Sequence, residues 1–136
     1  ERALDAVHHA LVLTGHGLRA RFVVANVQSP ANLYELVVAH DPQVLQQVSE
    51  AAGRDLVKPA VQLLQAAGLQ VEQDVATGDP AHTLVEIVER HACDAVILSA
   101  HGSSGRRTQM GSVASELLQI AQVPVTLVRP QQRDSD

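Results

Sequence analysis

Aromatic side chains are almost absent from this sequence of 136 residues, which has one phenylalanine, one tyrosine and no tryptophan. The core must therefore be aliphatic, and no row of aromatic rings is available on which the bases of a single strand could stack. The net charge of −5 argues against nucleic acid as a partner, because nucleic-acid binding requires a basic surface. The single cysteine, Cys93, excludes a disulfide framework and a cysteine-rich metal site.

Long apolar runs are also absent, and those present are too short to span a bilayer. The first residues show no signal-peptide pattern. We therefore expect no membrane partner and a cytoplasmic location. The length suits one domain, and an apolar fraction of 46% is ordinary for a globular core.

Helix and strand patterns alternate along the chain. Helical periodicity covers residues 3–13, 41–67, 80–91 and 112–121. Strand patterns, which are apolar and contain β-branched residues, cover residues 21–27, 69–76, 95–98 and 123–128. Asp79-Pro80 combines an N-cap residue with proline at the first helical position, as does Asp41-Pro42. Pro59 should kink or split the long helix. The alternation predicts an α/β fold, an open parallel sheet with helices on both faces.

The chain opens inside a helix pattern, with no strand and no capping residue before it. A parallel sheet whose first helix follows no strand is unusual. We therefore expect that a strand belongs before Glu1 and that residues 1–136 form a single domain incomplete at its N-terminus.

The stretch 94–118 contains the strongest chemical signal. A buried strand leads into a loop of small residues, and Gly111-Ser112 then opens a helix. A glycine-rich loop lets backbone N–H groups approach an anion, and a helix N-terminus adds oriented donors and a positive dipole end. The stretch matches neither the Walker pattern nor the dinucleotide fingerprint. The alternative stays open that these residues only form a turn and a helix cap.

Six short segments carry a resemblance to a known family. They are Ala3-Leu-Asp-Ala6, Val24-Ala-Asn-Val27, Gly78-Asp-Pro80, Cys93-Asp-Ala-Val-Ile97, Gly111-Ser112 and Val123-Pro-Val-Thr-Leu-Val128. In this order and spacing the chain resembles the universal stress protein family over essentially its whole length. The resemblance implies an adenine nucleotide α-hydrolase-like fold with five parallel strands in the order 3-2-1-4-5. The strand absent here would be the central first one, which normally carries an aspartate near the adenine. The resemblance therefore implies a gap at the centre of the sheet.

ATP-binding members of that family have a loop of the form Gly-x2-Gly-x9-Gly-Ser/Thr. In this sequence Ser99 occupies the place of the first glycine, whereas Gly102, Gly111 and Ser112 match the other defined positions. The spacing between Gly102 and Gly111 is one residue shorter than in the pattern. The resemblance thus implies ATP as the ligand, with Mg²⁺ as its companion ion, and the Ser99 side chain as an obstacle to close approach.

The resulting candidate site lies where open α/β sheets bind ligands, at the carboxyl ends of the strands. Its nucleotide-binding residues are Val27, Leu98, Ser99, His101, Gly102, Gly111, Ser112 and Val113. The adenine is expected between Val27 and Leu98, and the phosphates over Gly102 and the start of the last helix. Each residue also has a plainer interpretation, as core, loop or cap.

No catalytic residue and no metal ligand is assigned. Asp79, His82 and Glu86 have a spacing that metal ligands can show, but ordinary polarity at a helix start explains them as well. No acidic pair for Mg²⁺ and no positioned general base is evident, so a slow ATPase is the weakest hypothesis.

The expected function is a stress-response regulatory module that binds ATP or a related adenine nucleotide and acts as a homodimer. Val123, Val125 and Leu127 form an apolar strand edge through which two copies could pair. The alternative is a dimerisation and interaction module of the same fold that binds no nucleotide.

Overall fold

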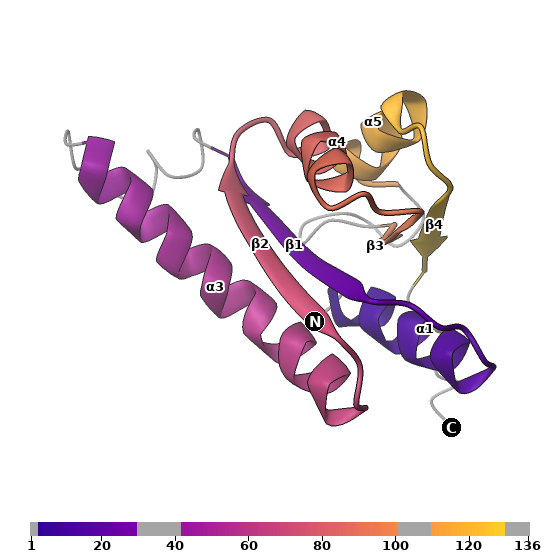
Figure 1. The fold of residues 1–136 in the computed structure, drawn as a ribbon. Helices are drawn as coiled ribbons and strands as arrows, with labels where there is room; N and C mark the ends of the chain where they lie inside the picture. The colour runs from indigo at the N-terminus through magenta and orange to yellow at the C-terminus, as the bar shows by residue number, and fades with distance from the viewer. Residues whose placement is uncertain (1–2, 30–41, 101–109, 130–136) are drawn as a thin grey trace, which may run out of the picture.

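The computed structural model describes residues 3–29, 42–100 and 110–129. The elements are α1 (Ala3–Gly15), β1 (Phe22–Gln28), α3 (Pro42–Ala66), β2 (Val71–Thr77), α4 (Pro80–Arg90), β3 (Val96–Ser99), α5 (Ser112–Ile120) and β4 (Val125–Val128). Each element predicted within the described ranges is present, with ends that differ from the prediction by at most two residues. Figure 1 shows their arrangement.

The helix starts and ends follow from local chemistry. Asp79 caps α4, since its carboxylate accepts a hydrogen bond from the backbone N–H of His82 at 3.2 Å, and Pro80 follows in the first turn. Pro59 does not split α3, which runs without interruption from Pro42 to Ala66. That part of the expectation was wrong, because burial of Val57, Ala60 and Leu64 on either side holds the helix together despite the missing N–H.

The strands form two parallel pairs. β1 pairs with β2 from Phe22↔Val71 to Gln28↔Thr77, and β3 pairs with β4 from Val96↔Val125 to Ser99↔Val128. Among the described residues no ladder joins β1 to β3, so the expected gap lies between these two strands. The parallel α/β architecture predicted from the sequence is confirmed.

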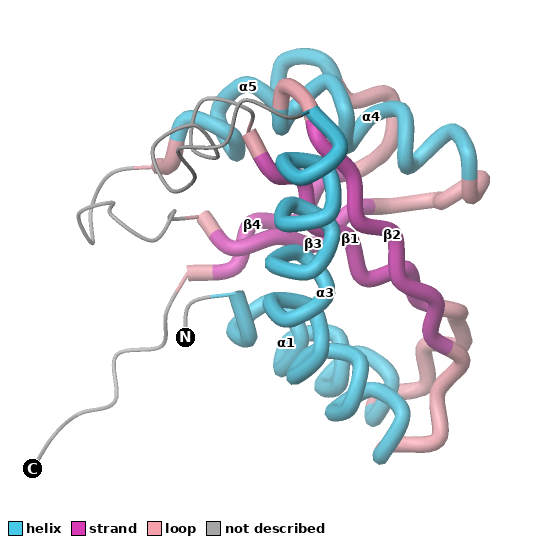
Figure 2. Tube along the Cα trace, turned by 90° about the vertical axis from the view of Figure 1, so that its left-hand side faces the viewer, coloured by secondary structure: helices cyan, strands magenta, loops and turns pink. Residues whose placement is uncertain are grey.

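Helices cover both faces of the strands. α1 and α3 lie on one face, where α3 contacts β1 and β2 and α1 contacts β3 and β4. α4 and α5 pack together on the other face, as the turned view in Figure 2 also shows. No helix in the described ranges is long and apolar enough to cross a membrane.

The main core lies between the first helix layer and the strands. Its buried members are Val7, Ala60 and Leu64, with Leu4, Leu11, Phe22, Val24, Leu63, Leu69 and Val71 packed around them. The core is aliphatic except for Phe22, as the composition required.

Helix α3 approaches the strands closely at one point. A Cβ added at Gly53 would lie 2.2 Å from Cγ1 of Val75. One turn earlier, the fully buried Ser49 hydroxyl lies 2.7 Å from the Thr77 hydroxyl at the end of β2. A small residue at position 53 therefore sets the distance between α3 and the β1–β2 pair.

Candidate functional site

The end of β3 and the start of α5 are held together by backbone hydrogen bonds. Ala100, which is fully buried, donates its N–H to the carbonyl of Val128 at 2.9 Å, and its own carbonyl accepts the N–H of Gly111 at 2.7 Å. These two bonds close the base of the loop between residues 100 and 111. The N-terminus of α5 is thereby fixed at the carboxyl ends of β3 and β4, where the sequence predicted the phosphates.

The first turn of α5 has no side-chain cap from its N-cap residue. Gly111 is that residue, in an extended conformation (φ −64°, ψ 155°), and it makes no side-chain hydrogen bond. The first intrahelical bond runs from the Ser115 N–H to the Gly111 carbonyl at 3.0 Å, so the N–H groups of Ser112 and Val113 precede the helical ladder. The start of α4 differs, because the Asp79 carboxylate there accepts the backbone N–H of His82.

One predicted phosphate donor is already engaged. The Gly111 N–H donates to Ala100 inside the protein, so it is not directed at a ligand in this structure. The sequence could not reveal this bond, since it depends on how the loop closes. The donors of this turn that remain for an anion are the backbone N–H groups of Ser112, Val113 and Ala114.

The two residues predicted to hold the adenine belong to different strand pairs. Val27 pairs with Ala76 in β1–β2, and Leu98 pairs with Leu127 in β3–β4; both side chains are half-buried. The Phe22 N–H and the Gln28 carbonyl form hydrogen bonds with Gln70 and Gly78, which flank β2. Successive residues of a strand direct their backbone groups to opposite edges, so the N–H and carbonyl of Val27 face the gap between the two strand pairs. Val27 and Leu98 thus occupy the carboxyl-terminal parts of the two strands that border the gap.

The remaining predicted site residues divide into two groups. Ser99 pairs with Val128 at the end of β3, next to the hydrogen-bonded junction with Gly111. His101 and Gly102 lie outside the described residues. The structure therefore brings Ser99 together with the start of α5.

A second cluster lies at the starts of α4 and α5. The Nδ1 atom of His82 is 2.6 Å from Oδ2 of Asp79 and 3.3 Å from Oε1 of Glu116. The hydrogen bond between the His82 ring and the Asp79 carboxylate holds the pKa of Asp79 below its ordinary value and raises the pKa of His82. The sequence grouped His82 with Glu86; Glu116 comes from another helix, and no spacing along the chain could have identified it.

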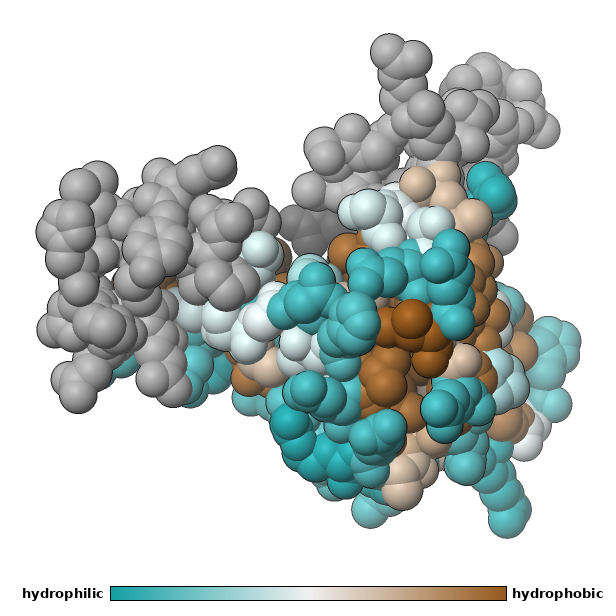
Figure 3. Space-filling view, turned by 90° about the horizontal axis from the view of Figure 1, so that it is seen from above, coloured by the Kyte–Doolittle hydropathy of each residue, from teal (hydrophilic) through white to brown (hydrophobic). Residues whose placement is uncertain are grey.

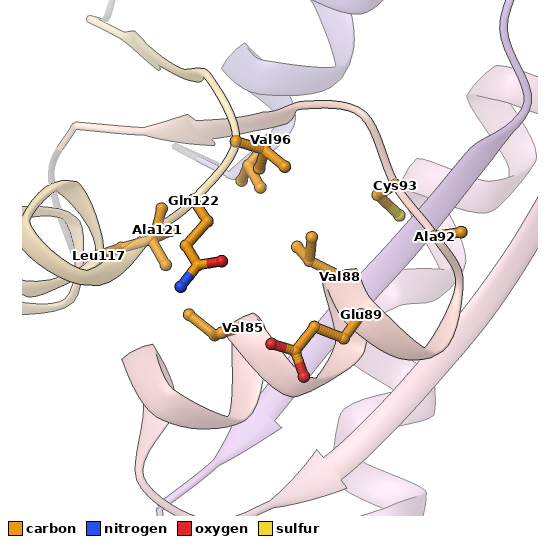
Figure 4. Close-up of a pocket in the computed structure, with 10 residues that line it drawn as sticks. Val85, Val88, Glu89, Ala92, Cys93, Val96, Leu117, Ala121 and Gln122 are labelled. Carbon is orange, nitrogen blue, oxygen red and sulfur yellow. The ribbon is translucent and has the colours of Figure 1, made fainter.

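Helices α4 and α5 also border an apolar groove of about 250 Å³. Val88 and Cys93 lie on one side of it and Leu117 on the other, with Glu89 and Gln122 among its polar residues (Figure 4). Seen from above, apolar surface is exposed between hydrophilic side chains (Figure 3). Burial is the main cause that raises the pKa of the Cys93 thiol, so the groove holds a protonated thiol.

The predicted dimer edge is shorter than expected. Strand β4 begins at Val125, and Val123 instead lines the groove between the helices. The Pro124 carbonyl accepts the Val96 N–H at 2.9 Å and so leads the chain into the ladder. Val125 and Leu127 remain on β4, whose only ladder in the described residues is with β3.

Comparison with known proteins places these features in a family. The model of the universal stress protein family matches residues 1–129. Universal stress protein MJ0531 of Methanocaldococcus jannaschii is 23% identical over 93 residues, which are 68% of this chain and 55% of that protein. Universal stress protein YxiE of Bacillus subtilis is 28% identical over 78 residues, 57% of this chain and 53% of that protein. The matched segments thus span about half the length of these relatives.

Solved structures show the same fold. The hypothetical protein MJ0577 superposes with a TM-score of 0.77 at 18% identity, covering 94% of this chain and 88% of that one. A universal stress protein in complex with cAMP superposes with a TM-score of 0.61 at 20% identity, covering 95% and 88%. The family match over nearly the whole chain, together with this fold, leads to one conclusion: the chain belongs to the universal stress protein family.

Proposed function

We propose that this chain binds ATP or a related adenine nucleotide at the carboxyl ends of β1 and β3 and acts as a stress-response regulatory module. The observation that carries the proposal is the start of α5. Its N-cap residue has no side chain, and the N–H groups of Ser112 and Val113 precede the helical ladder. An anion accepts hydrogen bonds from such donors and interacts favourably with the positive end of the helix dipole.

Two further observations support a nucleotide as the ligand. The half-buried Val27 and Leu98 supply apolar surface on both sides of the gap, as a purine base requires. A structural neighbour of this chain was solved in complex with cAMP, which is itself an adenine nucleotide. The phosphates would lie at α5 and the base toward Val27, with Mg²⁺ accompanying ATP.

Isothermal titration with ATP and with cAMP tests the proposal. In Gly111→Val, a branched side chain enters the first turn of α5, so binding should be lost while the fold persists. Gly15→Val is the matched control, because a Cβ at Gly15 meets no atom within 4 Å. Ser99→Gly should bind more tightly than the wild type, since it removes the side chain at the end of β3. Nucleotide binding that survives Gly111→Val unchanged would place the ligand elsewhere.

Dimerisation through β4 is a further part of the proposal. The outer edge of β4 carries no ladder in the described residues, and the strand is apolar and β-branched, which favours pairing with a second copy. Thr126 and Leu127 lie at its middle. Leu127→Lys should lower the dimer fraction in sedimentation, whereas a wild type that is monomeric at micromolar concentration contradicts this arrangement.

The second candidate function is a dimerisation and interaction module that binds no nucleotide. Ser99, at the place of the family's glycine, is the observation that favours it. A β4-dependent dimer that gives no heat with ATP or cAMP would support this candidate. In either case we propose a cytoplasmic location, on the sequence grounds given above.

A further inference from the structure

The cluster of Asp79, His82 and Glu116 joins two helices that are distant along the chain. Asp79 is the N-cap of α4, His82 lies in the first turn of α4, and Glu116 lies in α5. Their side chains are accessible from solvent, with exposed fractions of 56%, 64% and 44% respectively. One potential ligand atom from each residue lies within 4.8 Å of the other two.

We propose that Asp79, His82 and Glu116 form a binding site for a divalent transition-metal ion of the zinc class. One imidazole nitrogen and two carboxylate oxygens form a donor set that suits zinc, and a set containing imidazole is not what Ca²⁺ or Mg²⁺ prefers. Three protein ligands leave a fourth position for water. The ion would link the first turn of α4 to α5.

The two distances from His82 Nδ1 bracket those around such an ion, and the Asp79 and Glu116 oxygens, which lie within 4.8 Å of each other, would move to the same spacing. Metal–ligand bonds of about 2.0–2.2 Å place two tetrahedral ligand atoms roughly 3.3 Å apart. The separation of His82 Nδ1 from Glu116 Oε1 is 3.3 Å. The 2.6 Å contact between His82 and Asp79 is a hydrogen-bond distance that must widen when a metal replaces the shared proton. The exposed Asp79 carboxylate can rotate, and its second oxygen can take over the cap of α4.

A second histidine cluster lacks these properties. Each ring nitrogen of His91 lies near a different carboxylate, Nε2 at 2.8 Å from Asp74 and Nδ1 at 3.3 Å from Glu72. Arg90 already places its guanidinium 2.7 Å from the same Asp74 oxygen. A protein cation thus already occupies the Asp74 carboxylate of that cluster, and its donor atoms do not converge on one point. Around His82 no described arginine or lysine forms an ion pair with Asp79 or Glu116.

The proposal is tested by titrating the untagged chain, freed of metal and nucleotide, with Zn²⁺ by calorimetry and with Co²⁺ by visible absorption. The wild type should bind one equivalent and show the d–d bands of a four- or five-coordinate cobalt ion. His82→Gln, Glu116→Gln and Asp79→Asn should each weaken binding by at least about 10–100-fold. Asparagine keeps the cap of α4, so Asp79→Asn isolates the loss of the carboxylate ligand.

His8→Gln is the control, because His8 is an exposed histidine on α1. It should bind metal like the wild type. A site that needs only His82, with Glu116→Gln binding as tightly as the wild type, would overturn the three-ligand site. The three-ligand site would also be overturned if no binding is detected at zinc concentrations up to about 1 mM, because only weak surface contacts have dissociation constants above that value. Because no nucleotide is present, the result is independent of the proposed nucleotide site.

Discussion

The close approach of α3 to β2 makes Gly53→Ala a sharp test of the packing. The added Cβ would lie 2.2 Å from Val75 Cγ1, 3.3 Å from Val75 Cβ and 3.1 Å from the Asn26 side-chain oxygen. Carbon atoms in contact prefer about 3.5–4.0 Å, so α3 would have to move outward by more than about 1 Å. Val75 cannot simply rotate away, because its Cβ is also too close and a β-branched side chain has few rotamers.

The expected magnitude is the difference of two effects. Overpacking by one methyl group costs about 1–3 kcal/mol, and the contact here lies at the severe end of that range. Replacing glycine by alanine in a helix interior gains about 1 kcal/mol. Displacing α3 also weakens the hydrogen bond between the buried Ser49 and Thr77. We therefore expect Gly53→Ala to lower the free energy of unfolding by about 2 kcal/mol.

Urea unfolding followed by circular dichroism measures this change. Gly15→Ala is the matched control, since a Cβ there meets nothing within 4 Å, and it should raise stability by about 0.5 kcal/mol. In Val75→Ala the clashing Cγ1 is gone, so adding Gly53→Ala to that background should cost much less than it does in the wild type. A Gly53→Ala variant as stable as the wild type would refute the packing of α3 described above.

Three further outcomes follow from burial and backbone chemistry. Leu117→Ala should lower the free energy of unfolding by about 2–5 kcal/mol, because Leu117 is 0% exposed, whereas Leu118→Ala, at a side chain that is 44% exposed, should cost less than about 1 kcal/mol in the same urea assay. Pro59→Ala should stabilise the chain by up to about 3 kcal/mol, since it restores a backbone donor inside α3; a loss of stability would show that the proline is required there. Burial raises the pKa of Cys93, so less thiolate is present at pH 8 than in free cysteine, and iodoacetamide should react more slowly with the folded than with the urea-unfolded chain; equal rates would contradict this.

Local signals in the sequence determined the elements. The N-cap and proline of Asp79-Pro80 start α4 where they predicted, and Gly111-Ser112 starts α5. Gly68 follows the end of α3 with a positive φ of 79°, which glycine adopts at little cost. These signals succeed because capping, periodicity and turn preferences depend on residues only a few positions apart.

The sequence also predicted a candidate site, which stays a prediction. The loop of small residues before Gly111 indicated an anion at the start of a helix, and the family resemblance indicated where the base would lie. The sequence could not show that the Gly111 N–H is used by Ala100, nor that Val123 leaves the last strand to line the groove. Both depend on how the chain closes between β3 and β4.

Only the tertiary structure decided which side chains from different elements meet. His82 was matched along the chain with Glu86, but the packing of α4 against α5 places Glu116 at 3.3 Å from its ring. The division of the strands into two pairs was anticipated from the family resemblance, yet the register of each pair is a property of the folded chain. The physical reason is the same in each case: spacing along a helix or strand fixes which residues share a face, whereas the partner of that face is set by burying the faces of several elements together.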